Sequence, residues 1–205
     1  VIIEPVQGRG GMRTLPPGTL ARLAERCQRD GALLILDEIY TGFGRCGSRF
    51  AFEAEGVTPD LLCLGKGMAS GFPLSACLGR REVMEAWGAS EGEAIHTQTF
   101  LGNPVGCAMA LATLSELDRI VPMGQETGEW LGAELDRRGY AVRGRGLMRA
   151  VKIDDALEVS RALLRRGFIA LPAGERAAVL AITPPLTIRR AQLSGFLDAL
   201  DEVRR

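Results

Sequence analysis

The fold is decided by residues 32–38, which read ALLILDE. Five apolar residues followed by two acidic ones are typical of a strand that is covered on both faces in a parallel sheet. The preceding segment predicts a helix with one apolar face between Leu20 and Cys27, and Gly31 is expected to end it. Residues 1–6 are rich in β-branched side chains and predict a strand before that helix. Strand, helix and strand together predict a βαβ unit.

Two further apolar runs, residues 61–64 and 74–79, extend this pattern. The first hundred residues are therefore expected to form part of an open α/β sheet. Ligands of such sheets bind in the crevice outside the carboxyl ends of the strands. Asp37 and Lys66 each follow a predicted strand directly, so we expect both side chains at that rim.

The second part of the chain has a different pattern. A long helix is predicted from Pro104, with Asn103 as its N-cap, and we expect it to bridge two domains. The elements expected beyond it are short strands at residues 140–142, 147–153, 168–171 and 179–182, a helix near residues 157–164 and a last helix from about Arg190. We therefore expect one domain at residues 1–135, including the long helix, and a small α+β domain at residues 136–205.

Composition excludes several classes of function. The 25 basic and 25 acidic residues give a formal net charge of +0, without a long run of like charge, so neither nucleic acid nor a membrane surface is an expected partner. No apolar stretch reaches the ~18 residues of a membrane span. The five cysteines are odd in number and never form a C-x-x-C pair, which argues against a disulfide framework and favours the cytoplasm. His96 is the only histidine, so no metal site is expected.

Lysine is rare in this chain. Of the 25 basic residues, 23 are Arg and only Lys66 and Lys152 are Lys. Lys66 stands between two glycines after an apolar run, where burial would favour the neutral, nucleophilic amine. The alternative interpretation is an exposed turn lysine, but the scarcity of Lys favours a functional role.

The acidic pair after residues 32–36 is the second candidate. Asp37 is expected to be largely buried, where a carboxylate needs a cation or several hydrogen-bond donors. Glu38 is expected on the opposite face of the strand, so the two carboxylates would not form an acid/base pair. A capping or turn carboxylate is the alternative for Asp37.

Two other motifs carry weaker signals. Residues 42–47 match the dinucleotide-binding pattern G-x-G-x-x-G, but the acidic residues before it and the missing acidic residue ~20 positions beyond it argue against that function. Thr97, Thr99 and Gly102 precede the long helix, where a phosphate could bind, and a simple capping loop is an equally good interpretation.

Several segments together resemble the class III (omega-type) aminotransferases. They are EPVQG at residues 4–8, LDEIYTGFGR at 36–45, LGKG at 64–67, TFLGNP at 99–104, RGRGL at 143–147 and TPPL at 183–186. The resemblance covers essentially the whole chain in the family's order. It implies a partial large domain of the fold-type I, pyridoxal 5'-phosphate (PLP)-dependent transferases, with a mostly parallel sheet, followed by the small α+β domain.

The resemblance also implies an activity. PLP would be the cofactor, and an amino group would move from an amine or amino acid to a 2-oxo acid. Lys66 would hold the cofactor as a Schiff base and then move the substrate proton, and Asp37 would keep the pyridine nitrogen protonated. These two residues are therefore the implied catalytic residues.

Other residues match cofactor-binding positions of the family. Ile39 would pack against the ring, and Tyr40 stands where a Gln that contacts the cofactor's phenolic oxygen is usual. Gln7 belongs to the same implied cofactor-binding group. Thr99 resembles the threonine that reaches a cofactor phosphate in the neighbouring subunit, which implies a homodimer with shared active sites.

The chain departs from the family at the substrate side. Ala181 stands where members acting on amino acids commonly have an Arg, and Arg9 replaces a frequent Glu. We hypothesise that Arg9 supplies the missing positive charge, with Glu4 as a second substrate-binding candidate.

The family's N-terminal segments are not matched, so we expect this chain to be the C-terminal half of a longer enzyme. A non-catalytic truncated product, and a related PLP-dependent aminomutase or decarboxylase, are the alternatives.

Overall fold

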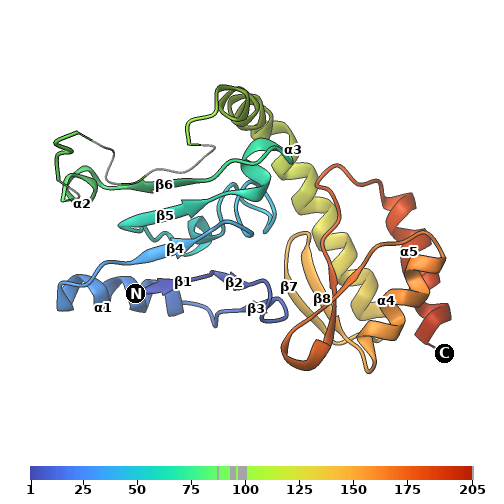
Figure 1. The fold of residues 1–205 in the computed structure, drawn as a ribbon. Coiled ribbons are helices and arrows are strands. Elements are labelled where there is room, and N and C mark those ends of the chain that lie inside the picture. Colours follow the sequence, from blue (N-terminus) through green and yellow to red (C-terminus); the bar gives the residue numbers. More distant parts are fainter. Residues whose placement is uncertain (87, 93–95, 97–100, 205) are drawn as a thin grey trace.

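The computed structural model describes residues 1–86, 88–92, 96 and 101–204, and these form two four-stranded sheets and a short hairpin (Figure 1). The strands of the first sheet and of the hairpin are β1 (Ile2–Ile3), β2 (Val6–Gln7), β3 (Arg13–Thr14), β4 (Ile35–Asp37), β5 (Leu61–Leu64) and β6 (Ala76–Gly79). The first sheet has the strand order β1-β4-β5-β6, and β2 pairs with β3 alone.

The first sheet is mostly parallel, as the sequence predicts. β1 pairs with β4, and β4 pairs with β5, in parallel, whereas β6 pairs with β5 in the antiparallel direction. β6 is antiparallel because the chain after β5 turns back through the 3-10 helix η2 (Lys66–Ala69) without a crossover helix. The expected strand is shorter than the apolar run, because only Ile35 and Leu36 of residues 32–36 lie in β4; Leu34 and Leu36 are buried, whereas Leu33 is exposed.

Helix α1 (Thr19–Asp30) connects β1 to β4 and completes the predicted βαβ unit. It ends at Gly31, as predicted, where the backbone is left-handed and the Gly31 N–H donates to the Cys27 carbonyl. The single strand expected over residues 1–6 is wrong. It divides into β1 and β2 around Pro5, which has no N–H to donate to a sheet.

Helix α3 (Pro104–Arg137) contacts both parts of the structure (Figure 1). Asn103 caps it as predicted, since its side-chain oxygen accepts from the N–H groups of Val105 (3.0 Å) and Gly106 (3.2 Å). Along its length α3 packs first on η2 and then on strands of the second sheet. Gly128 allows this approach, because a Cβ there would lie 2.4 Å from the Gly146 carbonyl carbon.

The second sheet is antiparallel and has the order β7-β8-β10-β9. Its elements and helices are β7 (Val142–Arg145), β8 (Met148–Lys152), α4 (Ala156–Arg165), β9 (Leu171–Ala173), β10 (Val179–Ile182) and α5 (Arg190–Arg204). Figure 1 shows α4 and α5 on the side of this sheet away from the first sheet. Leu135, Leu163 and Leu180 are fully buried in the core between them.

Two of the expected strands begin later in the chain than predicted. The strand expected at residues 168–171 begins only at Leu171, because Phe168 instead packs edge-on against Phe196 at 5.8 Å. The strand expected at 140–142 begins at Val142, since the Tyr140 side chain turns into the core. The remaining described helices are η1 (Ala51–Glu55), α2 (Arg81–Glu85) and η3 (Glu175–Ala177).

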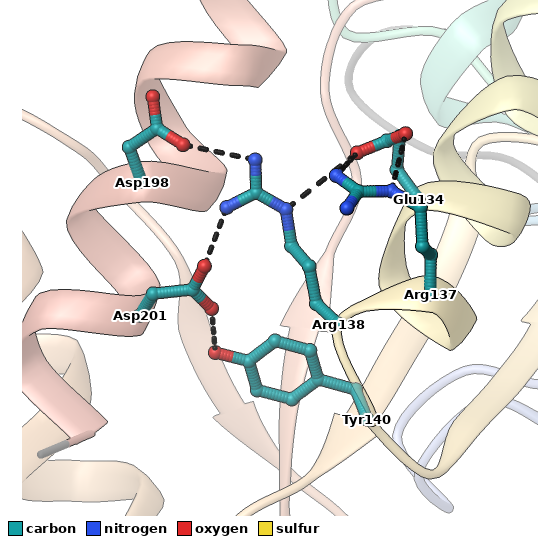
Figure 2. A network of polar contacts seen from close by, with 6 residues as sticks. All are labelled: Glu134, Arg137, Arg138, Tyr140, Asp198 and Asp201. Carbon is teal, nitrogen blue, oxygen red and sulfur yellow. Dashed lines mark hydrogen bonds and ion pairs between the residues drawn. The ribbon is translucent and has the colours of Figure 1, made fainter.

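A polar network joins the end of α3 to α5 (Figure 2). The Arg138 guanidinium donates to Asp198 (2.9 Å) and Asp201 (2.5 Å) and lies 3.6 Å from the Glu134 carboxylate. The Tyr140 hydroxyl donates to the other oxygen of Asp201 at 2.7 Å. Burial and this hydrogen bond to Asp201 raise the pKa of Tyr140 to about 12.

Tyr140→Phe should lower the free energy of unfolding by about 1 kcal/mol near pH 7, because it removes one hydrogen bond to a carboxylate. The pKa of Tyr140 is higher in the folded chain than in the unfolded chain, so its stabilising contribution is complete below pH ~10 and is lost as the pH rises through about 12. Urea unfolding between pH 7 and 12 measures both effects. An identical pH dependence in the variant would contradict this account.

Candidate active site

Lys66 opens η2 at the carboxyl end of β5, as the sequence predicts. Its backbone φ is +44°, a left-handed conformation that costs a non-glycine residue ~1 kcal/mol and is often found at functional sites. The expected burial of Lys66 is wrong, because its side chain is exposed. The turn sits at the rim of the sheet, and the Tyr40 ring is the aromatic group that faces the amine, with its centroid 4.3 Å from Nζ.

Asp37 ends the neighbouring strand β4 and lies directly opposite Cys63 of β5. Both candidate catalytic side chains therefore come from the carboxyl ends of adjacent parallel strands. Asp37 is partly buried, and its Oδ1 accepts from the Ile39 N–H at 3.0 Å. The fully buried carboxylate of the pair is its neighbour, Glu38.

Glu38 is fully buried and structural. Its carboxylate accepts from the Thr41 hydroxyl and from the N–H groups of Ala51 (3.0 Å) and Phe52 (2.9 Å). Burial raises the pKa of Glu38, and these three hydrogen bonds act against that shift. Glu38 thus anchors η1, and its contacts lie away from Asp37, as strand alternation predicts.

Tyr40 and Ile39 lie beside the lysine turn. The Tyr40 hydroxyl donates to Thr183 Oγ1 at 3.3 Å, and Gly8 is needed beside its ring, since a Cβ there would lie 2.4 Å from Tyr40 Cδ1. Ile39 packs against the lysine turn: a Cβ added at Gly65 would lie 3.3 Å from Ile39 Cγ2.

A cleft of about 540 Å³ opens at Lys66 and Tyr40. Arg45 and Pro185 also line it, so the cleft is bounded by both the first sheet and the segment after β10. Arg45 is not among the predicted site residues, although it belongs to the segment that matches the dinucleotide pattern. Its guanidinium donates to the carbonyls of Pro184 (2.5 Å) and Leu147 (3.2 Å), and burial lowers its pKa.

The predicted substrate-binding residues lie on the loop around β2. Glu4 accepts from the Gly8 N–H at 3.0 Å, so it holds the turn in place. Gln7 and Arg9 are exposed, and within the described chain Arg9 makes no ion pair. The Arg9 carbonyl accepts from the Gly174 N–H at 3.0 Å.

Ala181 is buried in the middle of β10, opposite Ala150 and Leu171. Thr99 and Thr97, the candidate phosphate-binding residues, lie outside the described residues.

The described ranges, residues 1–86, 88–92, 96 and 101–204, also bear on metal binding and on membrane insertion. Over these ranges, no three His, Cys, Asp or Glu side chains are grouped in a way that could hold a metal ion. No helix of the described part combines the length and apolar character that a membrane crossing requires.

The fold and the paired strand ends identify a fold-type I transferase. Solved structures support this class, including the ornithine aminotransferase from Toxoplasma gondii (TM-score 0.89, 34% identity, covering 99% of this chain and 50% of that one). An (S)-enantioselective omega-transaminase from Thermomicrobium roseum is similar as well (TM-score 0.87, 33% identity, covering 100% of this chain and 51% of that one).

The family model described as aminotransferase class-III matches residues 1–203, and the chain belongs to this family. Among curated relatives, a 4-aminobutyrate aminotransferase from Mycobacterium leprae is 39% identical over 99% of this chain and 49% of its own length. An acetylornithine aminotransferase from Methanopyrus kandleri is 40% identical over 100% of this chain and 53% of its own length. The chain thus spans about half the length of the relatives it matches.

The cofactor of this family is PLP, and the Toxoplasma structure is described with PLP at its active site. The residues present here fit that group. Lys66 offers an exposed amine that makes no ion pair with a described carboxylate, and the second carboxylate oxygen of Asp37 accepts no hydrogen bond from the described residues. An amine for the aldehyde and a carboxylate for the ring nitrogen are the two groups that PLP requires.

Proposed function

We propose that this chain carries the lysine-bearing part of a PLP-dependent aminotransferase that moves an amino group from an amine or amino acid to a 2-oxo acid. One observation carries the proposal: Lys66 and Asp37 stand at the carboxyl ends of adjacent parallel strands, and Lys66 opens into a cleft. The membership in the aminotransferase family supports the same reaction.

Each residue has a distinct role in this proposal. Lys66 Nζ would hold the cofactor and afterwards carry the proton that leaves and returns at the substrate. The Asp37 carboxylate would be the partner that keeps the ring nitrogen protonated. Bound PLP supplies an electron sink for the charge that develops at the substrate carbon. Ile39 and Tyr40 are proposed to contact the cofactor beside the lysine turn, and Gln7 to complete the cofactor-binding set.

We further propose that Arg9 binds the substrate carboxylate and that Glu4 positions the loop on which Arg9 lies. The hydrogen bonds from the Gly8 N–H to Glu4 and from the Gly174 N–H to the Arg9 carbonyl support this role, because they hold the loop on both sides. Ala181, which is buried and apolar, offers no charge for this purpose.

Arg9→Ala should raise the KM for the 2-oxo acid about tenfold with little change in kcat, since one charge-assisted contact to a carboxylate is lost. Arg13→Ala, at an exposed position on β3, serves as the matched control. Steady-state kinetics with varied 2-oxo acid measures the effect. An unchanged KM would remove Arg9 from the substrate site.

The proposed assembly is a homodimer in the cytoplasm, in which Thr99 would reach a cofactor phosphate of the second subunit. Support for a covering partner comes from the exposed apolar side chains of α3, among them Leu111 (68% exposed) and Val105 (56% exposed). The cysteines of the chain are free thiols, which favours a reducing compartment. We also propose the division into domains at residues 1–135 and 136–205.

Covalent capture tests the proposed function. The chain is incubated with PLP, reduced with borohydride and digested with trypsin, which cleaves after Lys and Arg. Modification of Lys66 blocks cleavage there and leaves residues 50–80 as one peptide. Lys152, the second lysine, is exposed and provides an internal control. Preferential labelling of Lys66 is the expected result, and equal labelling of both lysines would favour the non-catalytic alternative.

Turnover is then measured on the protein in which the chain occurs in the cell. Amine consumption that depends on pyruvate or 2-oxoglutarate supports the aminotransferase. Loss of carbon dioxide, or migration of the amino group within one molecule, would instead identify a decarboxylase or an aminomutase.

A further inference from the structure

Three side chains form a row across the first sheet, next to the lysine turn. Asp37 of β4 lies opposite Cys63 of β5, and Cys63 lies opposite Cys77 of β6. Residues opposite one another on neighbouring strands project from the same face of the sheet. The two cysteines are therefore direct cross-strand neighbours, with Asp37 on the far side of Cys63.

The distance between these strands suits a disulfide. Directly opposite residues of an antiparallel pair have Cα separations of ~4.5–5.5 Å, and disulfides form at Cα separations of ~4.4–6.8 Å. Both thiols are free. Cys77 is exposed, whereas Cys63 is half-buried, so an external reagent reaches Cys77 first.

The surroundings assign different roles to the two thiols. Burial raises the pKa of Cys63, and the nearby Cys77 and Asp37 raise it further, so Cys63 is the less reactive of the two. Cys77 stands on β6, the last strand of the first sheet within the described residues; Leu78 and Gly79 after it are exposed as well, whereas Ala76 before it is half-buried. Cys77 is therefore the attacking thiol and Cys63 the resolving one.

We propose that Cys63 and Cys77 form a reversible modification site, which low-molecular-weight disulfides oxidise to a cross-strand disulfide. The Cys77 thiolate attacks one sulfur of the reagent, which forms a mixed disulfide and releases one thiol. The Cys63 thiolate then attacks the Cys77 sulfur and releases the second thiol. The reagent is reduced to two thiols, which take up the two protons that the cysteines lose. This chemistry does not depend on the proposed aminotransferase function.

The disulfide would have a defined structural effect. It would tie β6, whose one neighbour among the described strands is β5, to that strand and enclose the turn that carries Lys66. Opening of β6 requires that strand to separate from β5, which a covalent bond prevents. Hydrogen exchange of the β6 amides should therefore become ~10-fold slower or more in the oxidised chain.

The sequence around the pair permits a sharp test. Trypsin cleavage at Arg49, Lys66 and Arg80 places Cys63 alone on residues 50–66 and Cys77 alone on residues 67–80. The full chain is treated with oxidised glutathione, its remaining thiols are alkylated, and the unreduced digest is analysed by mass spectrometry. The expected product is peptide 50–66 joined to peptide 67–80, ~10-fold or more above any linkage that involves Cys107.

Cys107 is the matched control, because it is also an exposed free thiol but lies on α3. Cys107→Ser should leave the linked peptides unchanged. Cys77→Ser should abolish them and leave Cys63 alkylated, with no slowing of exchange in β6. A stable glutathione adduct on Cys77 beside an alkylated Cys63 would overturn the proposal, as would equal linkage of Cys77 to Cys63 and to Cys107.

Discussion

Lys66→Arg should abolish transamination, lowering kcat by ~10⁴-fold or more. Arginine keeps the positive charge but cannot act as the nucleophile or exchange the proton, because its guanidinium stays protonated. The fold is expected to survive, since Lys66 is exposed and its amine makes no ion pair with a described residue. Turnover with saturating PLP measures the loss of catalysis. The trypsin pattern after borohydride reduction measures the loss of covalent PLP capture at position 66.

Lys152→Arg is the matched control for this substitution. Lys152 is equally exposed, but it ends β8 in the second sheet and does not line the cleft that contains Lys66. It should retain full turnover and full capture of PLP at Lys66. Appreciable turnover in Lys66→Arg, or a similar loss in Lys152→Arg, would show that the chemistry does not depend on Lys66.

Asp37→Asn should produce the second largest loss, ~10²–10³-fold in kcat, with weaker binding of PLP. The amide has nearly the same shape as the carboxylate but carries no charge, so it does not hold the ring nitrogen in its protonated form. Kinetics and the absorbance of the bound cofactor report this change directly.

An inactive Asp37→Asn variant could have lost the partner of the ring nitrogen or could have lost folding stability, and a stability measurement separates these two explanations. Within the described part of the chain, the one hydrogen bond that Asp37 accepts comes from the Ile39 N–H, and the Asn side-chain oxygen can still accept it. Thermal unfolding without cofactor should therefore match that of the natural chain. Full activity at normal stability would assign the role of ring partner to another residue and reduce Asp37 to a turn carboxylate.

The local parts of the fold could be predicted from the sequence because each had a local cause. The run at residues 61–64 coincides with β5, Gly31 ends α1, and Asn103 caps α3. The direction of β6 was not predictable in this way, because a short apolar run does not reveal whether the chain turns back or crosses over. The break between β1 and β2 could have been predicted from Pro5, since proline lacks the N–H that a continuous strand needs.

Burial at the site was harder to predict than position. The sequence placed Lys66 and Asp37 at the correct strand ends, but Lys66 is exposed, Asp37 is only partly buried, and Glu38 is the fully buried residue. A strand's last residues lie at the rim, where exposure depends on what the rest of the fold places there. Contacts such as Tyr40 with Thr183 join distant segments, and no local pattern encodes them.

The contacts of Arg45 make the first sheet depend on the backbone of the segments around the second sheet, so the two parts cannot be exchanged independently between relatives. Its guanidinium reaches carbonyls of Leu147 and Pro184, so a chimera that takes the second sheet from a relative must reproduce both backbone oxygens. For these two hydrogen bonds the side-chain identity at positions 147 and 184 matters little, because only main-chain atoms accept. Compatibility between parental sequences would therefore be decided by loop length and backbone path around Arg45 rather than by percentage identity.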